Sequence, residues 1–238
     1  MLFFYVRHGD PIYDPDSLTP LGKRQAEAVG KRLAMHGVHK VYASTSDRAI
    51  ITAEPTCEIL KMDKTLVDFA NEDHAWHQLT IINEQGFRKW GFEDKKTRKL
   101  FSDPSVIALG QKWYEHPYFE GTTFKEGILR VQKECDDFFA ALGYEHIPGT
   151  GTYKIIESNA ARVAMFAHQG FGLAFLSCIL DIPYPQFCIH FDICHSGMTA
   201  IEFREDDGIA IPTVLTLSSD SHIYKEGLPT NYNNVLRF

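Results

Sequence analysis

Two short apolar runs constrain the fold of this chain more than any other feature. One is LFFYV at residues 2–6, and the other is RVAMFA at residues 162–167. The second run is almost continuously apolar, which is expected for a β-strand that is covered on both faces. Such strands belong to sheets that lie between two layers of helices. The two runs therefore predict a buried sheet with strands from both ends of the chain.

A strong helix signal follows the first strand. In the sequence LTPLGKRQAEAVGKRLAMHG, Thr19 is placed to cap the helix and Pro20 fits its first turn. Gly37 is a plausible end of this helix.

A second strand and helix come next. KVYA at residues 40–43 is the predicted strand, and the helix begins near Ser46. Pro55 lies inside this helix and lacks a backbone donor, so we expect it to kink or restart the helix.

Regular patterns return in the second half of the chain. We expect helices at 124–143 and 170–180 and strands at 198–205 and 211–219. The alternation predicts an α/β fold, a three-layer α/β/α sandwich around a mostly parallel sheet. Residues 1–238 are expected to form one domain, with a helical or irregular insertion at about 70–124 over the active site.

Composition limits the class of partner. Hydrophobic residues make up 44% of the chain, and the formal net charge of −7 argues against nucleic acid or an anionic membrane as the main partner. There is neither an uninterrupted run of 18 apolar residues nor a signal-peptide pattern. Five cysteines, an odd number, suit a reducing cytoplasm better than a disulfide framework.

Basic side chains follow three of the predicted strands. Arg7 and His8 follow the first, Arg48 lies in the first helical turn after the second, and His168 follows the strand at 162–167. Ligands of open α/β sheets bind at the carboxyl ends of strands. Cationic groups gathered there repel one another unless an anion lies between them.

Phosphate fits such a place well. Arginine offers a planar fork of donors that matches phosphate oxygens, and helix N-termini after Ser46 and Gly170 add free N–H groups. Gly9 and Gly170 permit close backbone approach. The residues alone therefore predict a phosphate site with histidines placed for chemistry.

Four motifs in order carry a specific resemblance. RHG, LTPLGKRQAEAVGKRL, STSDRAIITAE and FAHQG together resemble the histidine phosphatase superfamily, which has the phosphoglycerate mutase-like fold. The similarity spans about residues 2–72 and 125–220.

The resemblance implies roles for these residues. His8 would be the nucleophile that forms a phosphohistidine, and nearby cations would help keep it neutral. Arg7, Arg48 and His168 would hold the phosphoryl oxygens, His168 also acting as a catalytic residue. Neither a metal nor a cofactor is expected.

A proton donor is also implied. Relatives place an acidic residue about two dozen positions after the second arginine, where this chain has Glu72 followed by Asp73. Register favours Glu72, and a carboxyl beside a phosphate should have a raised pKa, which suits a general acid. Asp73 is the alternative, and a solvated loop carboxylate is the plain interpretation of both.

The sequence departs from the family in three places. HAWHQL stands where relatives have G-x-x-E-G, and the asparagine that often follows R-H-G is missing. Tyr13 could fill that space as a hydrogen-bond donor, or it could pack on the loop. SSDSHIY near the C-terminus leaves His222 as a weak candidate for the pocket, and Gln169 and Asp73 are further candidates for substrate contact.

Two other clusters allow rival interpretations. CIHFDICH at 188–195 groups cysteines and histidines, but its spacing does not match common zinc sites, so strand packing is favoured. RKWGFEDKKTRK at 88–99 is either a solvated basic surface or a lid over an anionic or aromatic substrate.

The sequence therefore predicts a cytoplasmic phosphomonoesterase that hydrolyses a small phosphorylated metabolite through a phosphohistidine. A cofactor-dependent phosphoglycerate mutase and a non-catalytic phospho-ligand binding module are the alternatives. Neither nucleic acid nor a membrane is an expected partner, and a homo-oligomer is left open.

Overall fold

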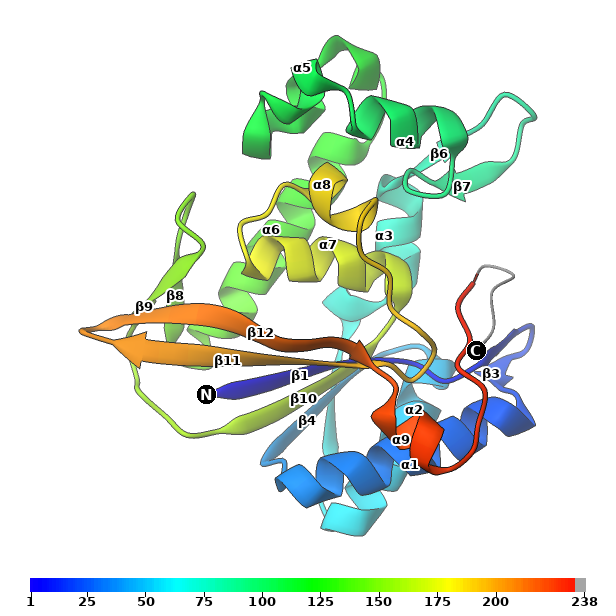
Figure 1. The fold of residues 1–238 in the computed structure, drawn as a ribbon, viewed down its shortest axis with the longest axis vertical. Coiled ribbons are helices and arrows are strands. Elements are labelled where there is room, and N and C mark those ends of the chain that lie inside the picture. Colours follow the sequence, from blue (N-terminus) through cyan, green and yellow to red (C-terminus); the bar gives the residue numbers. More distant parts are fainter. Residues whose placement is uncertain (234–238) are drawn as a thin grey trace.

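The computed structural model describes residues 1–233, in which strands and helices alternate along most of the chain (Figure 1). The main sheet contains β1 (Leu2–Arg7), β4 (Lys40–Ser44), β5 (Lys64–Val67), β8 (Tyr144–Ile147), β9 (Thr152–Ile155), β10 (Arg162–Ala167), β11 (Met198–Asp206) and β12 (Ile209–Ser219). Two small hairpins are β2 (Pro11–Tyr13) with β3 (Asp16–Leu18), and β6 (Thr80–Ile82) with β7 (Arg88–Trp90). The helices are α1 (Pro20–His36), α2 (Asp47–Leu60), α3 (Glu72–Gln78), α4 (Lys95–Phe101), α5 (Pro104–Ile107), α6 (Phe124–Ala140), α7 (Gln169–Ile179), α8 (Tyr184–Cys188) and α9 (Ser221–Lys225).

The sheet has the order β5-β4-β10-β1-β11-β12-β9-β8. Strands β5, β4, β10 and β1 run parallel, whereas every pairing from β1–β11 to β9–β8 is antiparallel. The α/β class is confirmed, but the sheet is mixed rather than mostly parallel. Asp207 (φ 45°) and Gly208 (φ 82°) form a tight turn that joins β11 directly to β12, and such a turn connects only antiparallel strands.

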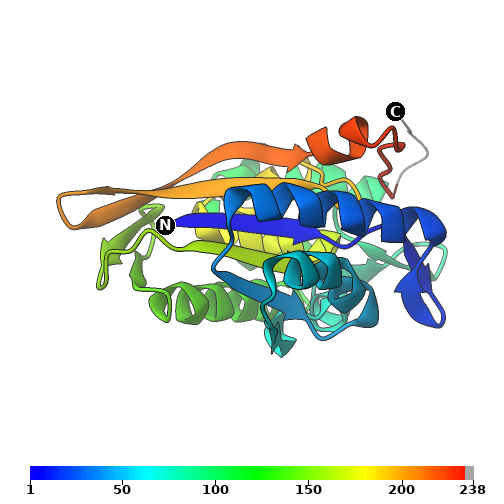
Figure 2. The same ribbon diagram turned by 90° about the horizontal axis from the view of Figure 1, so that it is seen from below.

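The three predicted layers are confirmed by the two faces of β1. Phe3 and Tyr5 point into a core shared with α6 and α7, whereas Phe4 and Val6 point into a core shared with α1 and α2. Alternation of side chains along a strand produces this division. Seen from below, α1 and α2 cover their face of the sheet (Figure 2).

The ends of the first two helices follow the sequence signals closely. The Thr19 side chain accepts a hydrogen bond from Gly22 N, and Gly37 ends α1 in the left-handed conformation at φ 69°. Helix α2 begins after Ser46 as predicted and continues through Pro55, so the predicted restart is wrong. Packing of α2 against α1, where Gly30 lies against Pro55, favours one continuous helix despite the missing donor.

The insertion at about 70–124 is built from short elements that pack around aromatic side chains. Trp113 is fully buried, and its ring lies 5.5 Å from Phe101 and 5.2 Å from Phe119. The insertion extends beyond α7 and α8, away from the main sheet (Figure 1). Across residues 1–233, no helix is both long enough and apolar enough to span a membrane.

Candidate active site

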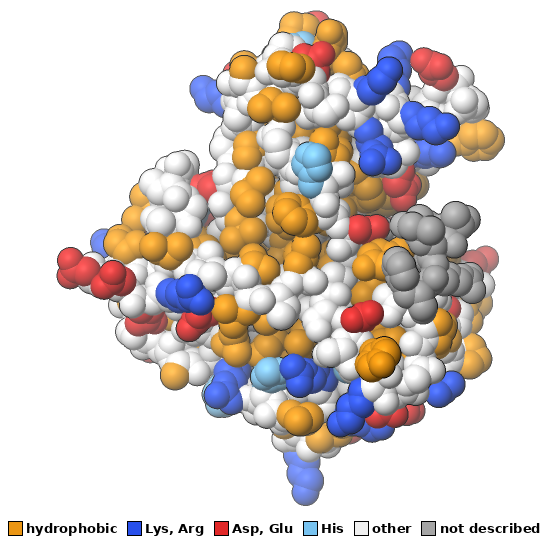
Figure 3. All heavy atoms as spheres, viewed as in Figure 1, with side chains coloured by type: hydrophobic (Ala, Val, Ile, Leu, Met, Phe, Trp, Pro, Cys, Tyr) orange, Lys and Arg blue, Asp and Glu red, His pale blue; other side chains and the backbone are white. Residues whose placement is uncertain are grey.

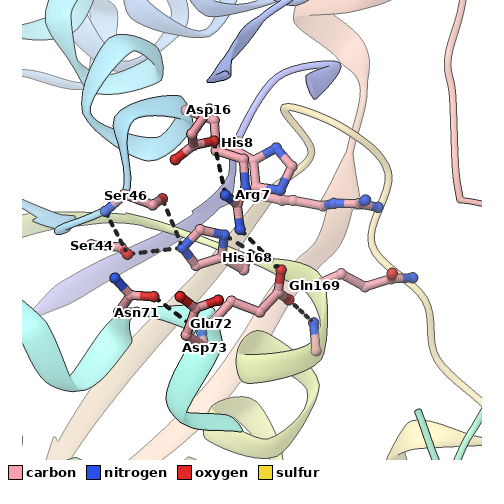
Figure 4. A network of polar contacts seen from close by, with 12 residues as sticks. Arg7, His8, Asp16, Ser44, Ser46, Asn71, Glu72, Asp73, His168 and Gln169 are labelled. Atoms are coloured by element: carbon pink, nitrogen blue, oxygen red, sulfur yellow. Dashed lines mark hydrogen bonds and ion pairs between the residues drawn. The ribbon is translucent and has the colours of Figure 1, made fainter. Parts of the chain in front are cut away.

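The residues that follow three parallel strands meet at one edge of the sheet (Figure 4). Pairing of β1 with β10 places Arg7 opposite Ala167, and pairing of β10 with β4 places Phe166 opposite Ala43. The backbone N–H of His8 donates to Ala167 O at 2.8 Å. This register brings together the basic residues that follow the three predicted strands.

His8 is held as a neutral imidazole with one nitrogen free. Its side chain is buried, and Nδ1 lies 2.7 Å from Gly9 O, so Nδ1 carries the hydrogen and Nε2 keeps its lone pair. Within residues 1–233, no hydrogen-bond partner occupies Nε2. Burial first, then His168, Arg7 and Arg48, lower the pKa of His8 well below its ordinary value. The ring is therefore uncharged and nucleophilic near neutral pH.

Arg48 projects from the first turn of α2 into a group of acidic side chains. Its guanidinium donates to Asp16 Oδ1 at 2.9 Å and to Glu72 Oε2 at 3.4 Å, and it lies 5.6 Å from the centre of the Tyr13 ring. Burial lowers the pKa of Arg48, but the bond to Asp16 and the charge of Glu72 outweigh it, so the pKa is raised. Asp16, the first residue of β3, was not among the predicted site residues.

Glu72, the first residue of α3, reaches the centre of the site. Its Oε1 accepts from Gly170 N at 2.8 Å, and its Oε2 lies 3.6 Å from His168 Nδ1. Burial raises the pKa of Glu72 above its ordinary value, although Arg48 and Gly170 act in the opposite direction. Asp73 points to the rim, where its side chain is exposed. The geometry therefore favours Glu72 as the proton donor.

His168 is fully buried between two serines and Glu72. Its Nε2 lies 2.8 Å from Ser44 Oγ and 3.2 Å from Ser46 Oγ, whereas the buried Nδ1 has no hydrogen-bond partner. Burial, then Arg48 and Arg7, lower the pKa of His168 well below its ordinary value. Its unpaired Nδ1 is available to a bound group.

Arg7 is buried and fixed mainly by the protein itself. Its guanidinium donates to Ile193 O at 2.7 Å and to Asn233 Oδ1 at 2.5 Å, and it lies 2.7 Å from His195 Nε2. Within residues 1–233, its Nε is buried without a hydrogen-bond partner. Arg7 therefore contributes a fixed positive charge and an unpaired Nε.

His195 was missed as a neighbour of the site. Its ring lies 5.8 Å from that of His8, and burial followed by Arg7 lowers its pKa to about 2. The strand predicted over CIHFDICH is wrong: α8 ends at Cys188, and a loop follows. No local pattern in the sequence distinguishes His195 from His190, which lies five residues earlier.

Gly9 and Gly170 were predicted to permit close approach of substrate to the backbone, but in the structure they make room for other parts of the protein. A Cβ on Gly9 would lie 2.5 Å from Gly22 O, so Gly9 allows β1 to approach α1 rather than substrate. A Cβ on Gly170 would lie 2.3 Å from the Trp90 ring. The Gly170 N–H already donates to Glu72, so it is not a free phosphate donor.

The other residues predicted to contact substrate do not all lie at the cavity. Tyr13 lies at the rim and is 62% exposed, and Gln169 lines the cavity, where its Oε1 accepts from Asn233 Nδ2 at 2.8 Å. His222 does not reach the cavity. It is buried on α9, where its Nε2 lies 2.8 Å from Ser196 Oγ. A role in the structure, not in substrate contact, fits this position.

A cavity of about 720 Å³ opens in front of Arg7 and Arg48. Of the basic run at 88–99, only Trp90 and Glu93 line this cavity. Lys95 and Lys96 line a separate hollow. Basic side chains gather on the surface around β6, β7 and α4 instead (Figure 3). The cavity is lined by Arg7, Tyr13, Asp16, Thr45, Ser46, Asp47, Arg48, Asn71, Glu72, Asp73, Trp76, Trp90, Glu93, Gln169 and Asn233.

Three of the central residues could also present ligands to a metal. One atom each of His8, Glu72 and His168 lie within 4.8 Å of one another. Arg48 contacts Glu72, and both Arg48 and Arg7 lower the pKa values of the two histidines. Positive charge at this distance disfavours a bound cation and favours an anion.

Comparisons with known proteins agree on the fold. The profile of the histidine phosphatase superfamily (branch 1) matches residues 4–211. A phosphoserine phosphatase from Entamoeba histolytica, solved with phosphoserine, has a similar structure with a TM-score of 0.60 at 17% identity, covering 93% of this chain and 98% of that one. A mycobacterial glucosyl-3-phosphoglycerate phosphatase has a TM-score of 0.58 at 16% identity, covering 92% and 98%. No curated protein matches the sequence significantly.

Proposed function

Because the chain belongs to the histidine phosphatase superfamily, we propose that it hydrolyses a small phosphate monoester through a phosphohistidine on His8. One observation carries the proposal: His8 Nε2 is free, and His8 presents a ligand atom within 4.8 Å of the Glu72 carboxylate. The imidazole of His8 and the carboxylate of Glu72 are thus close enough to act on the same phosphate ester. The two similar proteins described above are phosphatases, which favours the same class of reaction here.

In the first step, the lone pair on His8 Nε2 forms a bond to phosphorus as the bond to the leaving oxygen breaks. Glu72, whose pKa is raised by burial, gives its proton to that oxygen. In the second step, Glu72 takes a proton from water, whose oxygen attacks phosphorus. The N–P bond then breaks and releases phosphate and neutral His8.

The remaining residues act on charge rather than on bonds. The three non-bridging oxygens carry most of the charge in a loose transition state. Arg48, Arg7 Nε and His168 Nδ1 face the cavity or lie unpaired beside it, and they are proposed to hold these oxygens.

Five free cysteines are consistent with the proposed cytoplasmic location.

Replacement of the nucleophile tests the proposal. The His8→Ala variant is expected to lose p-nitrophenyl phosphate hydrolysis by about three orders of magnitude or more, since covalent catalysis is removed. Unchanged turnover would exclude His8 as the nucleophile. No turnover of any ester by the intact protein would favour a binding module, and fast isomerisation of 3-phosphoglycerate without phosphate release would favour a mutase.

A further inference from the structure

The part of the cavity wall beyond the phosphate residues is aromatic and acidic. Trp76 lines it, with its ring centre 5.1 Å from that of Trp90, which also lines it. Trp90 is fixed from behind by stacking on Phe92 and by contact with Gly170. A leaving group attached to the phosphate would lie against this wall.

The charges that line the cavity are unbalanced. Among residues 1–233, the cations of its lining are the two guanidinium groups of Arg7 and Arg48, and the site histidines are uncharged. The carboxylates of the lining are Asp16, Asp47, Glu72, Asp73 and Glu93. Even with Glu72 protonated, four negative charges remain against two positive ones. A phosphate dianion adds to this excess, so a positive charge elsewhere on the ligand would be favoured.

Three of these carboxylates are free to meet a ligand. Asp16 is already paired with Arg48, but in the described part of the chain the carboxylates of Asp47, Asp73 and Glu93 form neither a hydrogen bond nor an ion pair. Burial raises the pKa of Glu93 above its ordinary value, Lys89 lowers it, and the negative charges of Asp192 and Glu72 raise it. Lys89 lines two neighbouring hollows and does not line this cavity.

Buried, unpaired polar atoms beside the cavity also indicate a ligand-binding site. His168 Nδ1 and Arg7 Nε are buried, unpaired polar atoms beside it, and both residues are at most 1% exposed. Such atoms cost free energy unless a ligand or water pairs with them. A ligand that holds phosphate at these atoms has its other end in the rest of the cavity, where Trp76, Asp73 and Glu93 are among the lining residues.

We propose that the preferred substrate is a phosphate ester whose leaving group carries a positively charged amine or quaternary ammonium. The ammonium would lie over the Trp76 face and near the Glu93 and Asp73 carboxylates. Cations bind the faces of tryptophan favourably, and exposed acidic groups add to the attraction. This inference names the substrate class of the proposed phosphatase and depends on that activity.

Two esters of the same shape separate charge from size. Phosphocholine and 3,3-dimethylbutyl phosphate differ by a nitrogen in place of a carbon, and thus by one positive charge. With EDTA present, so that no divalent cation supplies the missing charge, we expect kcat/KM to be about tenfold higher for phosphocholine. The Glu93→Gln variant should lower this ratio about threefold, and Trp76→Leu should lower it as well. Glu120→Gln removes an exposed carboxylate of the same insertion and should leave the ratio unchanged.

The outcomes separate this inference from the proposed function. If both esters are hydrolysed and the ratio is near one or favours the neutral ester, the ammonium preference is wrong although the protein is a phosphatase. An equal ratio in the parent and in Glu93→Gln and Trp76→Leu excludes this wall as its source. If neither these esters nor p-nitrophenyl phosphate is hydrolysed, the proposed function itself fails.

Discussion

A buried histidine far from the cavity should make folding stability depend on pH. His146 on β8 lies between two carboxylates: its Nδ1 is 3.0 Å from Asp136 of α6, and its Nε2 is 3.1 Å from Asp181, which follows α7. Burial opposes the charged ring, but the bonds to Asp136 and Asp181 outweigh it and raise the pKa of His146 to about 9. The charged ring thus ties β8 of the sheet to α6 and to the end of α7.

The magnitude and its sign follow from this pKa. A rise from 6.5 to about 9 corresponds to at most about 3 kcal/mol of free energy of unfolding. Asp136 is partly exposed, so solvent screening reduces the expected contribution to about 1–2 kcal/mol. Because the folded pKa is the higher one, the contribution is complete below pH 6.5 and is lost as the pH rises through about 9.

Urea unfolding of the protein and of His146→Asn, at about pH 6 and about pH 10, measures this contribution. The difference between the two proteins should shrink by about 1–2 kcal/mol at the higher pH. His77→Asn, which changes an exposed histidine, corrects for the loss of a histidine as such. If His146→Asn and the parent lose the same stability between the two pH values, the charged bridge does not stabilise the fold.

Three further predictions concern the site. Gly170→Ala should lower the free energy of unfolding by about 1–3 kcal/mol and shift the tryptophan fluorescence, since its Cβ would lie 2.3 Å from the buried Trp90 ring; unchanged stability would contradict this packing. Glu72→Gln should lower kcat by about two orders of magnitude for an alkyl phosphate and much less for p-nitrophenyl phosphate, whose leaving group needs no proton; equal losses would exclude Glu72 as the acid. The pH profile of kcat/KM with an alkyl phosphate should rise as His8 becomes neutral, below its ordinary pKa, and fall as Glu72 ionises, above its ordinary pKa. The falling limb should disappear in Glu72→Gln.

Features determined within a few residues were predicted well. Thr19 and Gly37 bound α1 as expected, because a cap and a left-handed glycine act locally. The strand at 162–167 was predicted for a similar reason, since its apolar residues are buried whatever their partners. The predicted three-layer arrangement followed from these helices and strands.

Features determined by distant contacts were not predicted. The mixed sheet depends on the pairing of β1 with β11, about 200 residues apart in the chain, and neither strand shows its partner. His195 approaches His8 only because the loop after α8 returns to the end of β1, where Ser196 N donates to His8 O. Gly9 and Gly170 were expected to clear space for substrate, but the backbone of α1 and the Trp90 ring fill that space.

The proposed mechanism requires transfer of the phosphoryl group to His8, and one atom of its ring should receive it. Because Nδ1 of His8 donates to Gly9 O, the phosphoryl group should be attached to Nε2. The protein can be mixed with a phosphate ester that it hydrolyses, quenched in alkali during turnover and digested, and the phosphopeptide can be analysed by mass spectrometry and by chromatography against both phosphohistidine isomers. A peptide that carries Nε2-phosphohistidine at His8 is the predicted result. Phosphate on Nδ1 or on another residue, or turnover without any phosphoprotein, would contradict the account.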